Sequence, residues 1–114
     1  MSVYSDLPLY KASYDLVLEV FKLVKDFNRE YKYTIGESLT KKTIELVMLI
    51  YRANVNINKE EIIITAREKL EVIRLMVRLT KDLHQINTKK FVFVNIKIEN
   101  VSKQLTGWHK SIKS

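Results

Sequence analysis

Four of the five cations in residues 67–81, a stretch that reads REKLEVIRLMVRLTK, fall on one side of an α-helix. The four are Arg67, Arg74, Arg78 and Lys81. At about 100° per residue they fall within a sector of roughly 60° on an α-helix. Such a row can neutralise successive phosphates of a nucleic acid, which gives affinity without much reading of base sequence. The alternative is a solvated helix face with weak ion pairs to Glu71 and Asp82, but two acids against four bases leave the row net positive.

Further cations and aromatic residues lie outside this row. Lys89 and Lys90 follow it in the chain and are a second candidate for contact with an anionic partner. Tyr31 and Tyr33 bracket Lys32, and tyrosines interleaved with cations can stack single-stranded bases. The favoured interpretation of the two tyrosines is simpler: they pack the end of a helical bundle.

No group of residues indicates catalysis or metal binding. His84 and His109 are 25 residues apart, and neither has the spacing of a metal-ligand pair. The chain has no Cys, which excludes disulfides and thiolate sites. It has two Gly and neither of the common glycine-rich phosphate-binding motifs. We therefore expect no catalytic residue, no metal and no cofactor, so an enzyme is the least favoured class of function.

The charge balance points in the same direction as the cation row. The 114 residues have a formal net charge of +7. Residues 1–57 contain eight Lys/Arg and seven Asp/Glu, whereas residues 58–114 contain twelve and six. Cations concentrated in one half point to an anionic partner, most simply RNA or DNA. The chain lacks a membrane-length apolar run, and MSVYSDLPLYK does not read as a signal peptide, so we expect a cytoplasmic location and no membrane partner.

The elements that position these residues are expected to be helices, because two Gly and one Pro are too few for an all-β chain. Hydrophobic periodicity predicts four helices in a single domain of residues 1–114, at about 8–27, 35–53, 59–86 and 89–112. Capping residues are expected before three of them. They are Thr34 with Glu37, Asn58 with Glu61, and Thr88.

The last segment could also be a strand, because FVFVNIKIE alternates and is rich in β-branched residues. A longer apolar stripe at alternating spacings of four and three favours a helix instead. This stripe consists of Val94, Ile98, Val101, Leu105, Trp108 and Ile112. The fold class predicted is therefore all-α, an antiparallel up-down four-helix bundle.

The third helix has more apolar surface than one bundle face needs. A broad arc is expected to face the core and consists of Val72, Leu75, Met76, Leu79 and Leu83. Ala66, Leu70 and Val77 form a second strip, and exposed apolar strips mark interfaces. These three residues are predicted to form the interface of a ring-like homo-oligomer, in which rows of cations repeat. The alternative is that the extra apolar residues are scattered along the edges of a monomeric bundle.

Four blocks of the sequence, taken together, resemble a known family. In chain order they read LPLYKASYDLVLEVFKLVKDFNREYKYTIGESL, ELVMLIYRAN, AREKLEVIRLMVRLTKDL and NVSKQLTGWHKS. Over about residues 7–111 the chain resembles the four-helix-bundle proteins that include the accessory variability determinant (Avd) of diversity-generating retroelements. A related group of four-helix-bundle proteins is encoded by intervening sequences in large-subunit rRNA genes.

The resemblance to Avd implies a non-catalytic, basic accessory protein that forms a barrel-shaped homopentamer. The implied partners are the reverse transcriptase of the retroelement and nucleic acid, either template RNA or cDNA, during mutagenic retrohoming. The expected binding residues are Arg67, Arg74, Arg78, Lys81, Lys89 and Lys90. Two alternatives stay open: an oligomeric protein- or RNA-binding module of the rRNA-intervening-sequence type, and an oligomer that binds only protein.

Overall fold

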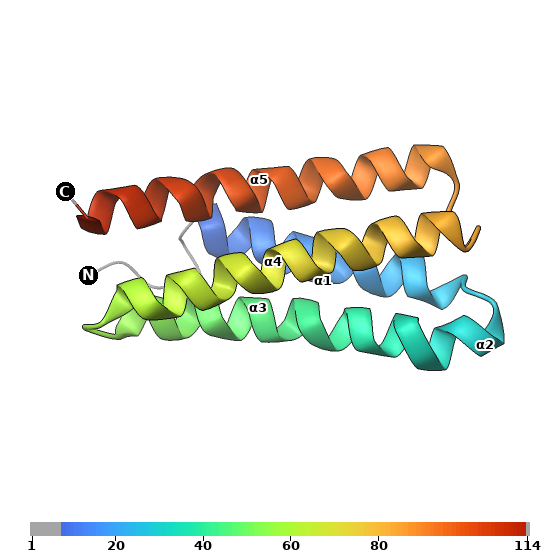
Figure 1. The fold of residues 1–114 in the computed structure, drawn as a ribbon, viewed down its shortest axis with the longest axis horizontal. Helices are drawn as coiled ribbons and strands as arrows, with labels where there is room; N and C mark the ends of the chain where they lie inside the picture. The colour runs from blue at the N-terminus through green and yellow to red at the C-terminus, as the bar shows by residue number, and fades with distance from the viewer. Residues whose placement is uncertain (1–7, 114) are drawn as a thin grey trace.

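The computed structural model describes residues 8–113, so residues 1–7, which begin the N-terminal stretch considered above, and residue 114 lie outside it. The described residues form helices and no strand. In chain order these are α1 (Pro8–Lys25), α2 (Arg29–Tyr31), the π-helix η2 (Lys32–Gly36), α3 (Glu37–Val55), α4 (Lys59–Asp82) and α5 (Thr88–Lys113). Because α2, η2 and α3 follow one another without a break, the chain makes four rods (Figure 1).

The four rods lie side by side in an elongated body with extents of 44 × 22 × 21 Å (Figure 1). The rod ending in α3 packs against α1 and α4, while α5 packs against α4 and α1. Short connections reverse the chain between successive rods, so neighbours along the chain are antiparallel (Figure 1). The predicted all-α four-helix fold is confirmed.

A buried stripe with the spacing of a coiled-coil seam explains why the rods assemble. On α5 the stripe is Val94, Ile98, Val101 and Leu105, all fully buried. Trp108 and Ile112 continue it and are partly buried against the core. Seams of this kind let helices pack at shallow crossing angles of about 20°. The prediction of a helix rather than a strand for this segment is therefore confirmed.

The structure reverses the two faces predicted for α4. Ala66, Leu70 and Val77 are at most 1% exposed and lie in the core of the single bundle. The prediction that these three residues form an oligomer interface is therefore wrong. They belong to a seam that repeats every three and four residues and consists of Ile63, Ala66, Leu70, Ile73, Val77 and Thr80.

The arc predicted to face the core of α4 is instead largely exposed. Val72, Leu75 and Leu79 are 43%, 68% and 45% exposed, respectively. The other two residues of the arc differ: Met76 is partly buried against the core, and Leu83 is half-buried. The arc contains many apolar residues, but the bundle buries the face that continues a straight seam next to α3 and α5. Apolar residues cover most of the circumference of α4, so their number does not determine which face is buried. The buried face is the one whose straight seam packs against α3 and α5.

The helix starts also differ from the predicted capping pattern. The second rod begins at Arg29, and Thr34 lies inside it, where its hydroxyl donates to the Glu30 carbonyl oxygen at 2.8 Å. Thr34 and Glu37 therefore do not form a capping box. Asn58 precedes α4 as predicted but makes no side-chain cap hydrogen bond. At α5, the side chain of Asn87, not Thr88, accepts a hydrogen bond from the Lys90 N–H at 2.8 Å.

Gly36 fixes the close approach of η2 to α1. A Cβ atom at this position would lie 2.7 Å from Val24 Cγ1 and 3.1 Å from the Tyr31 carbonyl oxygen. Any larger side chain would push the two rods apart at this end of the bundle. The absence of a side chain at Gly36 therefore sets the spacing between α1 and the start of α3.

Candidate functional site

The cation row of α4 lies along the side of that helix that meets α5. Arg67 Nη1 is 2.8 Å from His109 Nδ1 on α5. Arg74 donates to both oxygens of Glu71, at 3.2 and 3.3 Å, and forms an ion pair with Glu99 on α5. The cations of the row therefore lie on one side of α4, and two of them, Arg67 and Arg74, contact residues of α5.

The other predicted cations have different surroundings. Arg78 Nε lies 3.4 Å from Asp82 Oδ1, and both side chains are exposed. Lys81 Nζ lies 5.2 Å from the centre of the Phe91 ring, a cation–π contact across the α4–α5 junction. Lys90 Nζ lies 3.6 Å from Asp26 Oδ2. Lys89 is exposed and has no ion pair among residues 8–113. Four of the six predicted cations, Arg74, Arg78, Lys81 and Lys90, are thus held by carboxylates or a ring.

Four of the six lysines of α5 form no ion pair within residues 8–113, because only Lys90 and Lys113 contact an acid. We call the set Lys89, Lys97, Lys103 and Lys110 the basic face of α5. Three of the four are exposed, and Lys97 Nζ lies 4.9 Å from the centre of the exposed Phe93 ring. The one acid in α5, Glu99, is already bonded to Arg74. This face therefore combines unpaired cations with exposed apolar side chains, namely Val92, Phe93 and Ile96.

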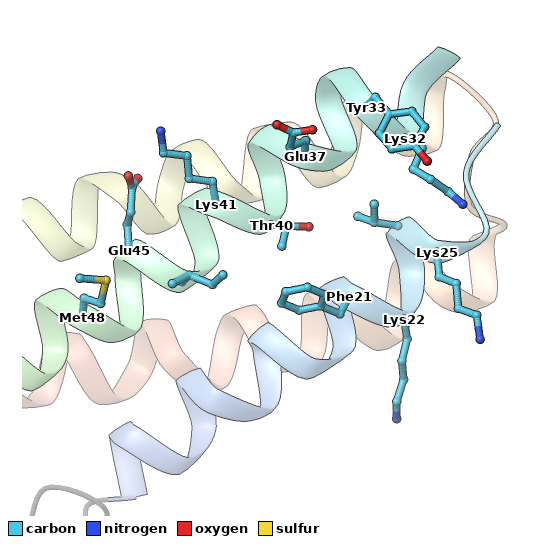
Figure 2. A pocket seen from close by; sticks show the side chains of 12 residues that line it. Phe21, Lys22, Lys25, Lys32, Tyr33, Glu37, Thr40, Lys41, Glu45 and Met48 are labelled. Carbon is cyan, nitrogen blue, oxygen red and sulfur yellow. The ribbon is translucent and has the colours of Figure 1, made fainter. Parts of the chain in front are cut away.

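A groove of about 920 Å³ lies on another side of the bundle, between α1 and α3 (Figure 2). We call it the α1/α3 groove. Phe21 projects from α1 toward α3, and Met48 lies farther along the groove on α3 (Figure 2). These side chains are 50% and 58% exposed, and Val24 and Ile44 complete the apolar lining. Four lysines also line it: Lys22, Lys25, Lys32 and Lys41.

The two tyrosines near this groove have different roles. Tyr31 is partly buried against the core, as the favoured interpretation of the sequence predicted. The same interpretation is wrong for Tyr33, which is 65% exposed and lines the end of the groove (Figure 2). An aromatic side chain is therefore available to a partner at only one of the two positions.

Two carboxylates show pKa values lowered by their partners. A hydrogen bond from Lys69, at 2.9 Å, lowers the pKa of Glu45. The His109 ring, 3.1 Å from Glu60 Oε2, lowers the pKa of Glu60, and the nearby charge of Lys113 acts in the same direction. Both pairs join α4 to a neighbouring helix, so they are contacts of the bundle and not a pair of catalytic acids.

The sequence model of the bAvd-like family matches residues 9–112. The chain belongs to the bAvd-like family. The predicted resemblance to Avd-type proteins is confirmed by this match, which spans nearly all of the described residues. A comparison with curated proteins finds no match.

All six cations predicted for this bAvd-like protein lie within the matched region. Sequence reasoning did not include Lys97, Lys103 and Lys110 among the site residues, although α5 has six lysines and a single acid. It also missed the α1/α3 groove. The available signal was a second apolar strip on α3 at spacings of four, three and four residues, which consists of Ile44, Met48, Tyr51 and Val55.

Among residues 8–113, no three His, Cys, Asp or Glu side chains are placed to hold a metal ion. No helix of that same part of the chain is long and apolar enough to cross a membrane. His84 lies exposed in the turn after α4, with a positive φ of 59°, far in sequence from His109.

Proposed function

We propose that this bAvd-like protein is a non-catalytic accessory protein of a diversity-generating retroelement. In the cytoplasm it binds the element's reverse transcriptase and nucleic acid, and it supports mutagenic copying of template RNA into cDNA. Membership of the family over residues 9–112 is the observation that carries this proposal. The unpaired cations of the basic face of α5 supply a surface suited to such partners.

Nucleic acid binds through its phosphates in this proposal. Lys89 and Lys110 are 21 residues apart on one helix, which separates them by about 32 Å along its axis. That length spans several phosphates of an extended strand. Arg67 and Arg78 flank the same side of the bundle and add to the positive potential. Phe93, which is 49% exposed, offers a ring on which an unpaired base can stack.

Assembly into a ring-like homo-oligomer, a pentamer by analogy with the resemblance to Avd, is part of the proposal. Exposed apolar side chains on α1, α3, α4 and α5 support it, because soluble monomers seldom leave large contiguous apolar patches uncovered. A ring repeats the basic face of α5 around an axis. Repetition raises the local potential more than one copy does and increases avidity for a long polyanion.

The nucleic-acid part is tested by measuring the affinity for template RNA at several salt concentrations. The variant Lys103→Glu with Lys110→Glu should weaken binding at least tenfold and make the slope of log K against log salt shallower by roughly 1 to 2. The matched control is Lys11→Glu with Arg52→Glu, which makes the same charge change at exposed positions of α1 and α3. Equal losses in both variants would show that net charge, and not the α5 face, determines binding.

The polymerase part has its own test. A reverse transcriptase gene and a near-duplicate template repeat should lie beside the gene for this protein, and the two proteins should co-purify when expressed together. If the purified protein does not bind RNA but still co-purifies with the polymerase, its function is restricted to protein binding. Absence of both the neighbouring gene and the complex would remove the retroelement assignment.

A further inference from the structure

The outer side of α4 combines apolar and acidic residues. We call it the α4 ridge. It consists of Ile64, Val72, Leu75 and Leu79 together with Glu61, Glu68, Glu71 and Asp82, all of which are exposed. At about 100° per residue these eight side chains occupy a sector of roughly 100° that contains no Lys or Arg of α4. Arg74 pairs with Glu71 and Arg78 pairs with Asp82, so Glu61 and Glu68 are the ridge acids without an ion pair in the described residues. The ridge is therefore an apolar strip with surplus negative charge at its N-terminal end.

The α1/α3 groove has the opposite character. Its apolar floor is flanked by Lys22, Lys25, Lys32 and Lys41, none of which forms an ion pair within the described part of the chain. Two acids also line the groove, Glu37 and Glu45 (Figure 2). Glu45 is held by Lys69 on α4, so its charge is compensated inside the bundle. The groove therefore offers an apolar surface with surplus positive charge along its edges.

Length also fits. The apolar part of the ridge, from Ile64 to Leu79, rises by about 23 Å along α4. The exposed strip of α3 from Ile44 to Val55 rises by about 17 Å. On the opposite wall, Tyr14, Leu18 and Phe21 extend the exposed apolar surface along α1. One helix can therefore lie along the groove with its apolar residues covered for most of their length.

We propose that the α4 ridge of one copy seats in the α1/α3 groove of a second copy. The inference rests on the homo-oligomer of the proposed function and specifies which surfaces meet. In this arrangement Glu61 and Glu68 of one copy lie beside Lys22 and Lys25 of the second copy, at the edge of an apolar contact. This arrangement matches the common anatomy of interfaces, an apolar core surrounded by a polar rim.

Charge excludes the other pairings of the same surfaces. Two grooves facing each other would oppose lysines to lysines, and two ridges would oppose acids to acids. The basic face of α5 is equally unsuitable as an occupant of the groove, because its apolar residues are flanked by Lys89 and Lys103. The surviving pairing is heterologous, since it joins two different surfaces. Heterologous contacts form closed rings when the rotation between copies closes, which agrees with the ring proposed above.

The decisive experiment uses one disrupted surface per variant. Leu75→Asp places a charge in the ridge, and Met48→Asp places one in the groove. Each variant alone should lose the oligomer and sediment as a monomer in analytical ultracentrifugation. An equimolar mixture should form a heterodimer, because it offers one intact groove and one intact ridge. A contact between identical surfaces could not produce this result.

Two controls distinguish the possible failures. Ile96→Asp changes a comparably exposed apolar residue of α5 and should keep the wild-type mass. Circular dichroism should show unchanged helix content in every variant, because all three positions are exposed. The double variant Lys22→Glu with Lys25→Glu reverses the charge beside the groove and should also break the oligomer. Mixing it with the double variant Glu61→Lys with Glu68→Lys, which reverses the charge of the ridge, should restore a contact between ridge and groove.

The outcomes separate this inference from the proposed function. A wild-type protein that is monomeric at high concentration would overturn both the ring and the ridge–groove contact, whatever the affinity for RNA. A wild-type oligomer that survives Leu75→Asp and Met48→Asp would overturn the ridge–groove contact alone and leave the ring in place. Loss of the oligomer in Ile96→Asp but not in Leu75→Asp would move the interface to α5.

Discussion

Helices α4 and α5 are neighbours of similar length, 24 and 26 residues, and each has apolar side chains that the bundle does not bury. They differ in the charges around those side chains. Acids surround the exposed apolar strip of α4, whereas lysines surround that of α5. Similar hydrophobic surplus therefore has a different electrostatic setting on each helix. In our proposals the α4 ridge contacts the lysine-lined groove of another copy, whereas the α5 face binds a polyanion.

The largest expected effect tests which side of α4 is the core. Leu70→Ala should lower the free energy of unfolding by about 3 kcal/mol, because Leu70 is 1% exposed and its loss leaves a cavity. Leu75→Ala should cost less than about 0.5 kcal/mol, because Leu75 is 68% exposed. Urea unfolding in the Met48→Asp background, which we expect to be monomeric, measures both without a contribution from assembly.

A matched pair on α5 sharpens the same comparison. Leu105 is fully buried and Ile96 is 62% exposed, so Leu105→Ala should again cost about 3 kcal/mol and Ile96→Ala little. Equal costs for Leu70→Ala and Leu75→Ala, with the α5 pair well separated, would show that the buried face of α4 is wrongly placed in this bundle.

The two helices also differ in how much of their packing the sequence predicts. On α5 the seam from Val94 to Leu105 stands out, because polar residues separate it from most other apolar positions. On α4 the seam through Ile63, Ala66 and Thr80 includes a small and a polar residue, so a wider arc with as many apolar residues concealed it. Spacing alone does not separate the two faces of α4, because Val72, Met76, Leu79 and Leu83 also alternate steps of four and three residues.

Contacts between helices explain what sequence could not predict about the site. The ion pair of Arg74 with Glu99 depends on the register of α4 against α5, which local patterns do not contain. The hydrogen bond from Asn28 N–H to Gln85 Oε1, at 2.7 Å, joins two turns 57 residues apart. The cation row was thus correctly found as a row, but its partial neutralisation became visible only in three dimensions.

A smaller effect is expected where α4 and α5 are joined by charge. Arg74→Met should lower the free energy of unfolding by about 1 kcal/mol, because it leaves Glu71 and Glu99 without their shared partner. Arg78→Met should cost less, about 0.3 kcal/mol, because Arg78 pairs only with Asp82 on its own helix. Thermal unfolding of both variants in low salt checks the difference. Equal costs would mean that the bond between the helices contributes nothing beyond a surface pair.

The smallest effect concerns pH at the other link between the two helices, Glu60 with His109. The hydrogen bond from the His109 ring lowers the pKa of Glu60 from its ordinary value of 4.5, and proximity to Lys113 lowers it further.

A carboxylate whose pKa is lowered in the folded state stabilises the fold at pH values above its ordinary pKa. It loses that contribution as pH falls through the lowered pKa. The wild type should therefore exceed Glu60→Gln in melting temperature at pH 6, and the difference should shrink as pH falls below 4.5 and vanish only below the lowered pKa. In the background His109→Phe the substitution of Glu60 should show a much weaker dependence on pH, because the main cause of the lowered pKa is gone. A pH dependence that survives unchanged in that background would assign the effect to Lys113, and the link between α4 and α5 at this end of the bundle would then be a simple surface pair.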